Sequence, residues 1–195
     1  MLMLTPEQIA QNKIEYLTLV ASLGIDIANL AYYLDQIGYF EAPASNQTYK
    51  AYAGGLCEHA LNVCNELRQL VPAYTANKYT IEDVIKIALF KDIYKAELYE
   101  SFERNVRDEE TGKWTTVVSY RNKAARPAFG DLGFSSYMIA KRFVDFTDEQ
   151  IEAICYQSLG IENGFKSKDI YEVLRQYPLV SLTHMADIAA SYLTE

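Results

Sequence analysis

The stretch Val84-Ile85-Lys86-Ile87-Ala88-Leu89-Phe90-Lys91-Asp92 decides the fold of this chain. Its first seven residues are apolar except for one lysine, and they predict a buried helix. Thr80, which is followed by acidic residues, predicts the N-terminal cap of that helix. Lys91 and Asp92 therefore bring an ammonium and a carboxylate side by side into the interior, where charged groups need partners.

The two histidines of the chain lie in patterns that indicate a functional site. His59 closes the segment Gly54-Gly55-Leu56-Cys57-Glu58-His59, directly after a glycine turn. His184 and Asp187 are three residues apart, which makes them neighbours on one helical face. A histidine, an aspartate after an apolar helix and a late aspartate form the skeleton of a metal-dependent phosphohydrolase site. Lys91 stands where such a site would have another histidine, so the pattern indicates altered or lost chemistry.

Composition limits the class of protein. A length of 195 residues predicts one domain, 1–195, and an apolar fraction of 50% permits a sizeable core. No apolar run approaches the roughly 18 residues that span a bilayer, and the N-terminus lacks the basic start of a signal peptide. Three cysteines without a CxxC pair indicate core thiols in a reducing cytoplasm. The net charge of −8 disfavours coating of nucleic acid but permits a small phosphorylated ligand.

The chain reads as mostly helical. Caps, breakers and periodicity predict helices at residues 5–24, 26–37, 56–70, 80–92 with an extension towards 99, 135–146, 147–159, a short one from 167 and one from 178 to 193. A β-hairpin is expected at 104–120, around a turn that contains Gly112. The expected fold is an all-α bundle with one small β-hairpin, in which residues 1–38 are N-terminal helices and 104–120 an insertion.

Four segments, in this order, resemble the HD-domain superfamily of metal-dependent phosphohydrolases, within it a group of small proteins common in phages and bacterial mobile elements. Residues 40–45 resemble "F-x-A-P-A-S", 54–63 resemble "G-G-L-x-E-H-S-L-x-V", 88–96 resemble "A-L-L-H-D-L-C-K-A", and 184–190 resemble "H-x-A-D-x-x-A". The resemblance covers about residues 39–193 and implies an HD-like helical bundle. It also implies a divalent metal, Mn, Fe or Mg, at the positions of His59, Asp92 and Asp187.

The departures from the family pattern concern its other histidines. Lys91 replaces the histidine of the His-Asp pair, and Tyr49, Asp131 and Gln157 stand where related sequences carry histidines. A lysine ammonium has no lone pair for a metal and repels a cation. We therefore expect Lys91 to pair with Asp92 and Asp187 and to take the charge role of the metal. Without a metal, the site has no ready route to hydroxide at neutral pH.

The resulting expectation is a catalytically degenerate HD-domain protein that binds a nucleotide-type ligand without hydrolysing it, with no assigned catalytic residue. In a phage, it would act in the host cytoplasm as a sponge for an immune nucleotide signal. The expected ligand-binding residues are Lys91, Asp92, His59, Lys95, Tyr49, Asp131, Gln157, Arg126 and Asp187.

Plainer explanations stay open for several of these residues. His59 can be a core histidine, Asp131 can cap a helix, and Lys95 can be a solvated lysine. The basic cluster of Arg121, Lys123 and Arg126 can be part of an ordinary solvated loop. Two other functions also stay open. One is an active phosphohydrolase with a depleted mononuclear site. The other is a protein-interaction module with a closed pocket, for which the hairpin is the first surface to test. A homo-oligomer is compatible with all of these.

Overall fold

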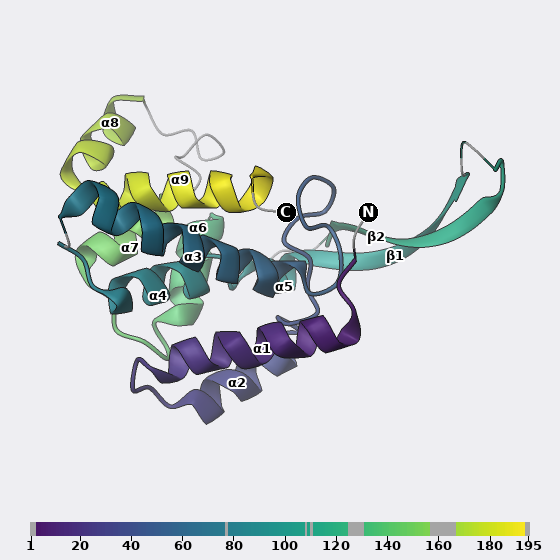
Figure 1. Ribbon diagram of the computed structural model, residues 1–195, viewed down its shortest axis with the longest axis horizontal. Coiled ribbons are helices and arrows are strands. Elements are labelled where there is room, and N and C mark those ends of the chain that lie inside the picture. The colour runs from purple at the N-terminus through teal and green to yellow at the C-terminus, as the bar shows by residue number, and fades with distance from the viewer. Residues whose placement is uncertain are drawn as a thin grey trace.

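The computed structural model describes residues 3–76, 78–107, 109, 111–124, 131–156 and 167–193. These residues form a mostly helical body and a two-stranded antiparallel sheet, as the sequence predicts (Figure 1). The elements are α1 (Pro6–Ala21), α2 (Ile27–Gln36), α3 (Gly55–Thr75), α4 (Ile81–Phe90), α5 (Lys95–Leu98), β1 (Tyr99–Arg107), β2 (Trp114–Asn122), α6 (Leu132–Ala140), α7 (Asp148–Cys155), α8 (Ser167–Gln176) and α9 (Pro178–Tyr192). None of the described helices is long and apolar enough to cross a bilayer.

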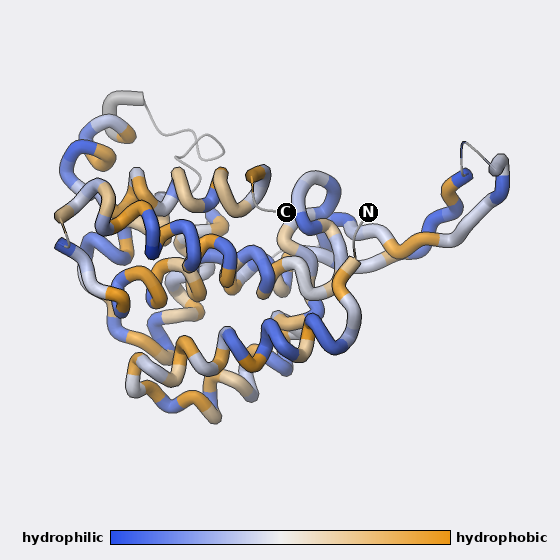
Figure 2. Tube along the Cα trace, in the orientation of Figure 1, coloured by the Kyte–Doolittle hydropathy of each residue, from blue (hydrophilic) through white to orange (hydrophobic). Residues whose placement is uncertain are grey.

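Helix α3 lies in the middle of the body and packs against α9, α4 and α1. Its apolar residues recur every three or four positions, which turns one stripe of the helix towards the core. Figure 2 shows such hydrophobic positions along all three neighbouring helices. The buried apolar side chains of this stripe are Leu56, Ala60, Val63, Cys64, Leu67 and Val71.

Local hydrogen bonds determine where helix α4 begins and ends. The Thr80 hydroxyl accepts from the Asp83 backbone N–H, and the Asp83 carboxylate accepts from the Thr80 N–H. The expected continuation towards Tyr99 is wrong, because α4 ends at Phe90 and a turn precedes α5. In that turn the Lys95 N–H donates to the Asp92 carbonyl, three residues back. This tight turn holds the Lys91 and Asp92 side chains in the interior.

Other expected boundaries also differ, among them the end of α7, which lies at Cys155 rather than 159. Helix α3 does not end before Pro72 but continues to Thr75. Pro72 and Arg68 are exposed, so water can bind the Arg68 carbonyl that a proline leaves without a donor. Helix α6 starts at Leu132 rather than 135, because the Asp131 carboxylate caps it, and it ends at Ala140. The hairpin is longer than expected, with Tyr99 paired to Asn122 and Arg107 to Trp114.

A buried tyrosine connects α1 to the end of α4 through a hydrogen bond. The Tyr16 side chain is 0% exposed, and its hydroxyl donates to the Leu89 carbonyl at 2.7 Å. This carbonyl lies in the last turn of α4, two residues before Lys91. The contact therefore supports the backbone that presents Lys91 and Asp92.

We predict that Tyr16→Phe lowers the free energy of unfolding by about 1–2 kcal/mol, because a buried hydrogen bond to a carbonyl is lost. Chemical denaturation would measure this change. The matched control is Tyr32→Phe, whose side chain is 67% exposed and should change stability little. Equal midpoints for the two variants would show that the buried hydroxyl does not stabilise the protein.

Candidate functional site

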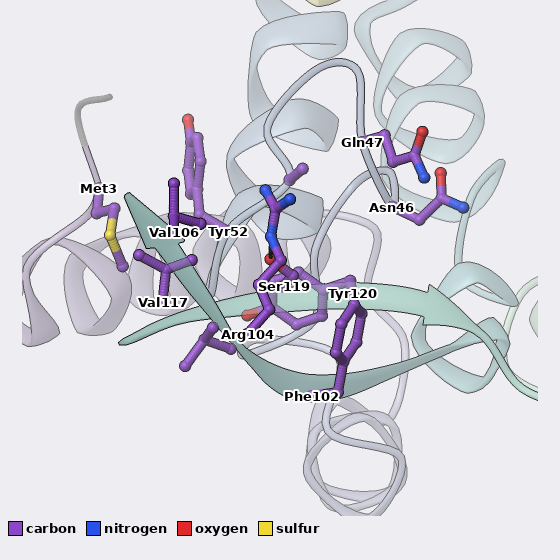
Figure 3. Close-up of a pocket in the computed structure, with 12 residues that line it drawn as sticks. Met3, Asn46, Gln47, Tyr52, Phe102, Arg104, Val106, Val117, Ser119 and Tyr120 are labelled. Atoms are coloured by element: carbon purple, nitrogen blue, oxygen red, sulfur yellow. Dashed lines mark hydrogen bonds between the residues drawn. The ribbon is translucent and has the colours of Figure 1, made fainter. Parts of the chain in front are cut away.

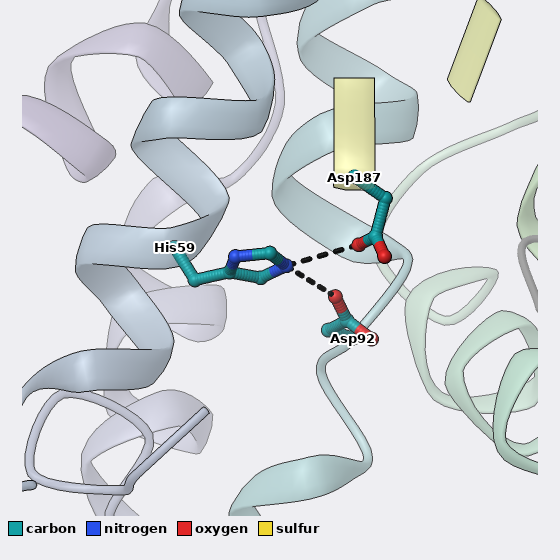
Figure 4. A group of neighbouring side chains, drawn as sticks. All are labelled: His59, Asp92 and Asp187. Atoms are coloured by element: carbon teal, nitrogen blue, oxygen red, sulfur yellow. Dashed lines mark hydrogen bonds and ion pairs between the residues drawn. The ribbon is translucent and has the colours of Figure 1, made fainter. Parts of the chain in front are cut away.

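The candidate site lies where α3, α9 and the turn after α4 meet. His59 comes from α3, Asp187 from α9 and Asp92 from the turn, and the three side chains point towards one another (Figure 4). His59 Nε2 lies 3.0 Å from Asp187 Oδ1 and 3.6 Å from Asp92 Oδ2. One nitrogen or oxygen atom from each residue lies within 4.8 Å of those of the other two. The spacing of these atoms would allow the three residues to hold a metal ion.

The glycine pair before α3 brings a loop across the start of the helix. Gly54 has φ +83°, a conformation that side chains rarely adopt. A Cβ on Gly55 would meet the Lys50 carbonyl oxygen at 2.2 Å. Lys50 and Tyr52 both bind the Glu58 carboxylate, at 3.2 and 2.7 Å. The loop is thereby held against α3, with the Tyr49 ring centre 5.1 Å from that of His59.

Lys91 occupies the centre of the site. Its side chain is fully buried, and its ammonium donates to Asp92 Oδ2 and to Asp187 Oδ1. These are the same two oxygens that His59 Nε2 approaches. The pairing expected from the sequence is therefore present, and the ammonium contacts the atoms that a metal would use.

Lys95 forms a second layer with tyrosines. Its ammonium lies 3.0 Å from Asp92 Oδ1 and donates to the Tyr49 hydroxyl at 3.0 Å. Tyr49 also contacts the ring of Tyr192, which is 67% exposed. The Asp187 side chain keeps 24% of its surface accessible, whereas those of His59, Lys91 and Asp92 keep at most 1%. The site therefore reaches solvent on the side of Asp187 and Tyr192.

The pKa values follow from this packing. Burial alone would raise the pKa of Asp92, but the Lys91 and Lys95 ammonium groups outweigh it and lower the pKa to about 2. Burial opposes the charge on Lys91 too, yet Asp187 and Asp92 keep its pKa above the ordinary value. Burial lowers the pKa of His59 despite the nearby carboxylates. At neutral pH the site holds two ammonium groups, two carboxylates and a neutral imidazole.

These groups do not fit a divalent metal as they stand. A metal would need the oxygens that already accept from Lys91, and the buried ammonium would repel it. A metal-binding histidine also normally donates its second N–H to an acceptor. His59 Nδ1 is buried and has no hydrogen-bond partner among the described residues. The neutral Nε2–H tautomer, which donates to Asp187, suits this environment better.

Other expected site residues lie elsewhere. Asp131 caps α6, where its carboxylate accepts from the Phe134 N–H at 2.7 Å, and neither it nor His184 belongs to the close group around His59. Arg121 pairs with Glu100 at 2.7 Å on the hairpin. Arg126 and Gln157 lie outside the described residues.

A cavity of about 650 Å³ lies apart from the charged site, between the hairpin, the segment 46–52 and Met3 (Figure 3). Its walls include Tyr52, Phe102 and Tyr120, and none of the expected ligand-binding residues lines it. Sequence reasoning missed these residues and also Tyr192. The sixteen tyrosines of the chain are the only hint of them in the composition, because the docking of a hairpin base has no local sequence signal.

Comparison with protein-family models, curated proteins and solved structures finds no match for this chain. The HD-domain resemblance therefore depends on the four sequence segments and stays a prediction.

We predict that Lys91→Met lowers the free energy of unfolding by about 3–5 kcal/mol at neutral pH, because it leaves the buried Asp92 carboxylate and the half-buried Asp187 carboxylate without their main partner. Lys13→Met is the control. Lys13 pairs with Asp35 at 2.6 Å with both side chains over a third exposed, so the loss should stay below about 1 kcal/mol.

The Lys91→Met effect should also depend on pH. The lowered pKa values of Asp92 and Asp187 contribute stability above their ordinary range, and this contribution disappears as pH falls towards 2. The gap between wild type and Lys91→Met should therefore shrink when unfolding is followed from about pH 7 to pH 3. A gap that stays constant over this range would contradict the charge balance described above.

Proposed function

We propose that this protein is a catalytically degenerate HD-domain protein that binds a small nucleotide-type ligand and does not hydrolyse it. The observation that supports this most directly is the Lys91 ammonium, which contacts both carboxylates of the His59, Asp92 and Asp187 group. In that position the ammonium supplies the positive charge that a metal would bring. It supplies no activated water, because an ammonium has no coordination site for one.

Donors and acceptors for such a ligand lie next to the accessible side of the site, where the Lys95 side chain itself is only 9% exposed. The Lys95 ammonium and the Tyr49 hydroxyl form a donor pair suited to phosphate oxygens. Asp187 offers a partly accessible carboxylate that could accept from sugar hydroxyls or base N–H groups. The charges of the two lysines and the two carboxylates cancel inside the site. A ligand would therefore be selected by the geometry of its hydrogen bonds more than by its net charge.

Aromatic surface accompanies these polar groups. The rings of Tyr49 and Tyr192 meet edge to face, with centres 5.9 Å apart, and Tyr192 is mostly exposed. Exposed tyrosines of this kind can stack on a base, a contact that contributes about 1–3 kcal/mol. A base against Tyr192 and a phosphate at Lys95 together describe a nucleotide. In a phage, a protein of this kind would act as a sponge for a host nucleotide signal.

The first test is native mass spectrometry with metal analysis, followed by a panel of cyclic di- and trinucleotides and ADP-ribose derivatives. We expect an intact nucleotide to bind without metal. Lys95→Met should weaken its binding about tenfold or more, since a hydrogen bond from a charged group is lost. Lys13→Met, far from the site, should bind as wild type does. Rapid conversion of the nucleotide by wild type would instead indicate the phosphohydrolase.

The spacing of His59, Asp92 and Asp187 supports a second test, which separates the degenerate site from an active one. We predict that Lys91→His binds one Mn²⁺ per chain and gains thermal stability with it, because an imidazole replaces the repelling ammonium. Wild type and Lys91→Met should show neither effect. Stoichiometric metal in wild type would favour an active mononuclear phosphohydrolase, and no metal in Lys91→His would count against the HD-type site.

A further inference from the structure

The hairpin of β1 and β2 projects from the helical body (Figure 1). Its two nine-residue strands pair along their whole length. Large apolar side chains on it are exposed: Trp114 is 70% exposed, and Val118 (54%) and Val106 (38%) also line the cavity at the base of the hairpin. Hydrophobic stretches are visible along the projecting part in Figure 2. An isolated two-stranded hairpin is only marginally stable in water, and additional strands normally support such a sheet.

The two edges of this hairpin differ in charge. Strand β1 carries Glu100, Glu103, Arg104 and Arg107, and charged residues on an edge strand hinder pairing with another chain. Strand β2 has no charged residue from Trp114 to Tyr120. Among the described residues, no backbone hydrogen bond connects β2 to a segment outside the hairpin. The edge of β2 is therefore open and lacks the protection that β1 has.

We infer that β2 pairs antiparallel with β2 of a second copy of this chain and forms a four-stranded sheet. In such a symmetric pair, one residue lies on the two-fold axis opposite itself. Trp114 and Val118 are four residues apart, with Thr116 midway between them. An axis at Thr116 therefore places Trp114 opposite the partner's Val118, and Val118 opposite the partner's Trp114. The two exposed apolar side chains of β2 cover each other.

The remaining pairs in this register are compatible. Thr116 faces its own copy, and Thr115 faces the partner's Val117. Aromatic residues beside β-branched ones, and threonines beside threonines, are among the stabilising cross-strand pairs. No like charges meet, because Lys113 lies opposite the partner's Ser119. A pair of β1 strands centred on their middle residue would instead place Glu103 against itself.

This partner is independent of the ligand proposed above, because the distal part of β2 is separate from the residues around Lys91. A second copy is the partner that this register supports, because the same strand supplies both the exposed Trp114 and the exposed Val118 that covers it. The pairing needs only the outer half of the strand, where residues 114–116 and 118 are exposed.

Size-exclusion chromatography with light scattering on the full chain tests the inference. We expect wild type to have twice the mass of one chain and Val118→Lys to have the mass of one. Ser101→Lys is the matched control, because it adds the same charge to an exposed position of β1, and it should remain dimeric. A monomeric wild type, or a Val118→Lys dimer, would overturn the inference.

Cysteine cross-linking keeps the test valid if Val118→Lys disturbs the hairpin. Thr116→Cys should form a disulfide-linked dimer under mild oxidation, because residue 116 faces itself across the axis. Asn105→Cys, which pairs with Thr116 inside the hairpin but belongs to β1, should not. Wild type, in which Cys57 and Cys64 are buried and Cys155 is half-buried, gives the background. Equal cross-linking of the two variants would contradict the β2 interface, as would none at residue 116.

Discussion

The structure depends on one buried charge balance, in which the Lys91 ammonium lies between the carboxylates of Asp92 and Asp187. An unpaired charge at this depth would cost several kcal/mol, so every element around it has to hold its side chains in place. Helix α3 supplies a neutral imidazole, α9 a carboxylate, and the turn after α4 both members of the central pair. The same balance that stabilises the fold would also limit which ligands the proposed binding site accepts.

The chemistry of the site follows from the position of Lys91. His59, Asp92 and Asp187 have possible ligand atoms within 4.8 Å of one another, and the Lys91 ammonium contacts both carboxylates of this group. A lysine cannot leave the site as an ion can, and it carries no water. The absence of a coordination site for water on the ammonium is the property that supports binding over hydrolysis as the proposed function.

Much of this arrangement could be predicted from sequence because its signals are local. The caps Thr5, Thr80 and Thr147 mark their helices, and the apolar run before Lys91 marks a buried one. The pairing of Lys91 with Asp187 followed from charge, because buried ions need partners. The end of α4 at Phe90, the cavity under the hairpin and the role of Tyr192 could not be predicted. Each depends on contacts between residues far apart in sequence, which no local pattern encodes.

The place of Asp187 in α9 has a consequence for the order of folding. His59 and Asp187 are 128 residues apart in the chain, and Lys91 and Asp187 are 96 apart. Until α9 docks, the two lysines of the site have only Asp92 as an internal counter-charge, and water must continue to solvate them. Closing such long loops is entropically unfavourable and slow. Docking of α9 is therefore the step that removes water from the site, and a nascent chain cannot complete the charge balance around Lys91 before α9 has been synthesised.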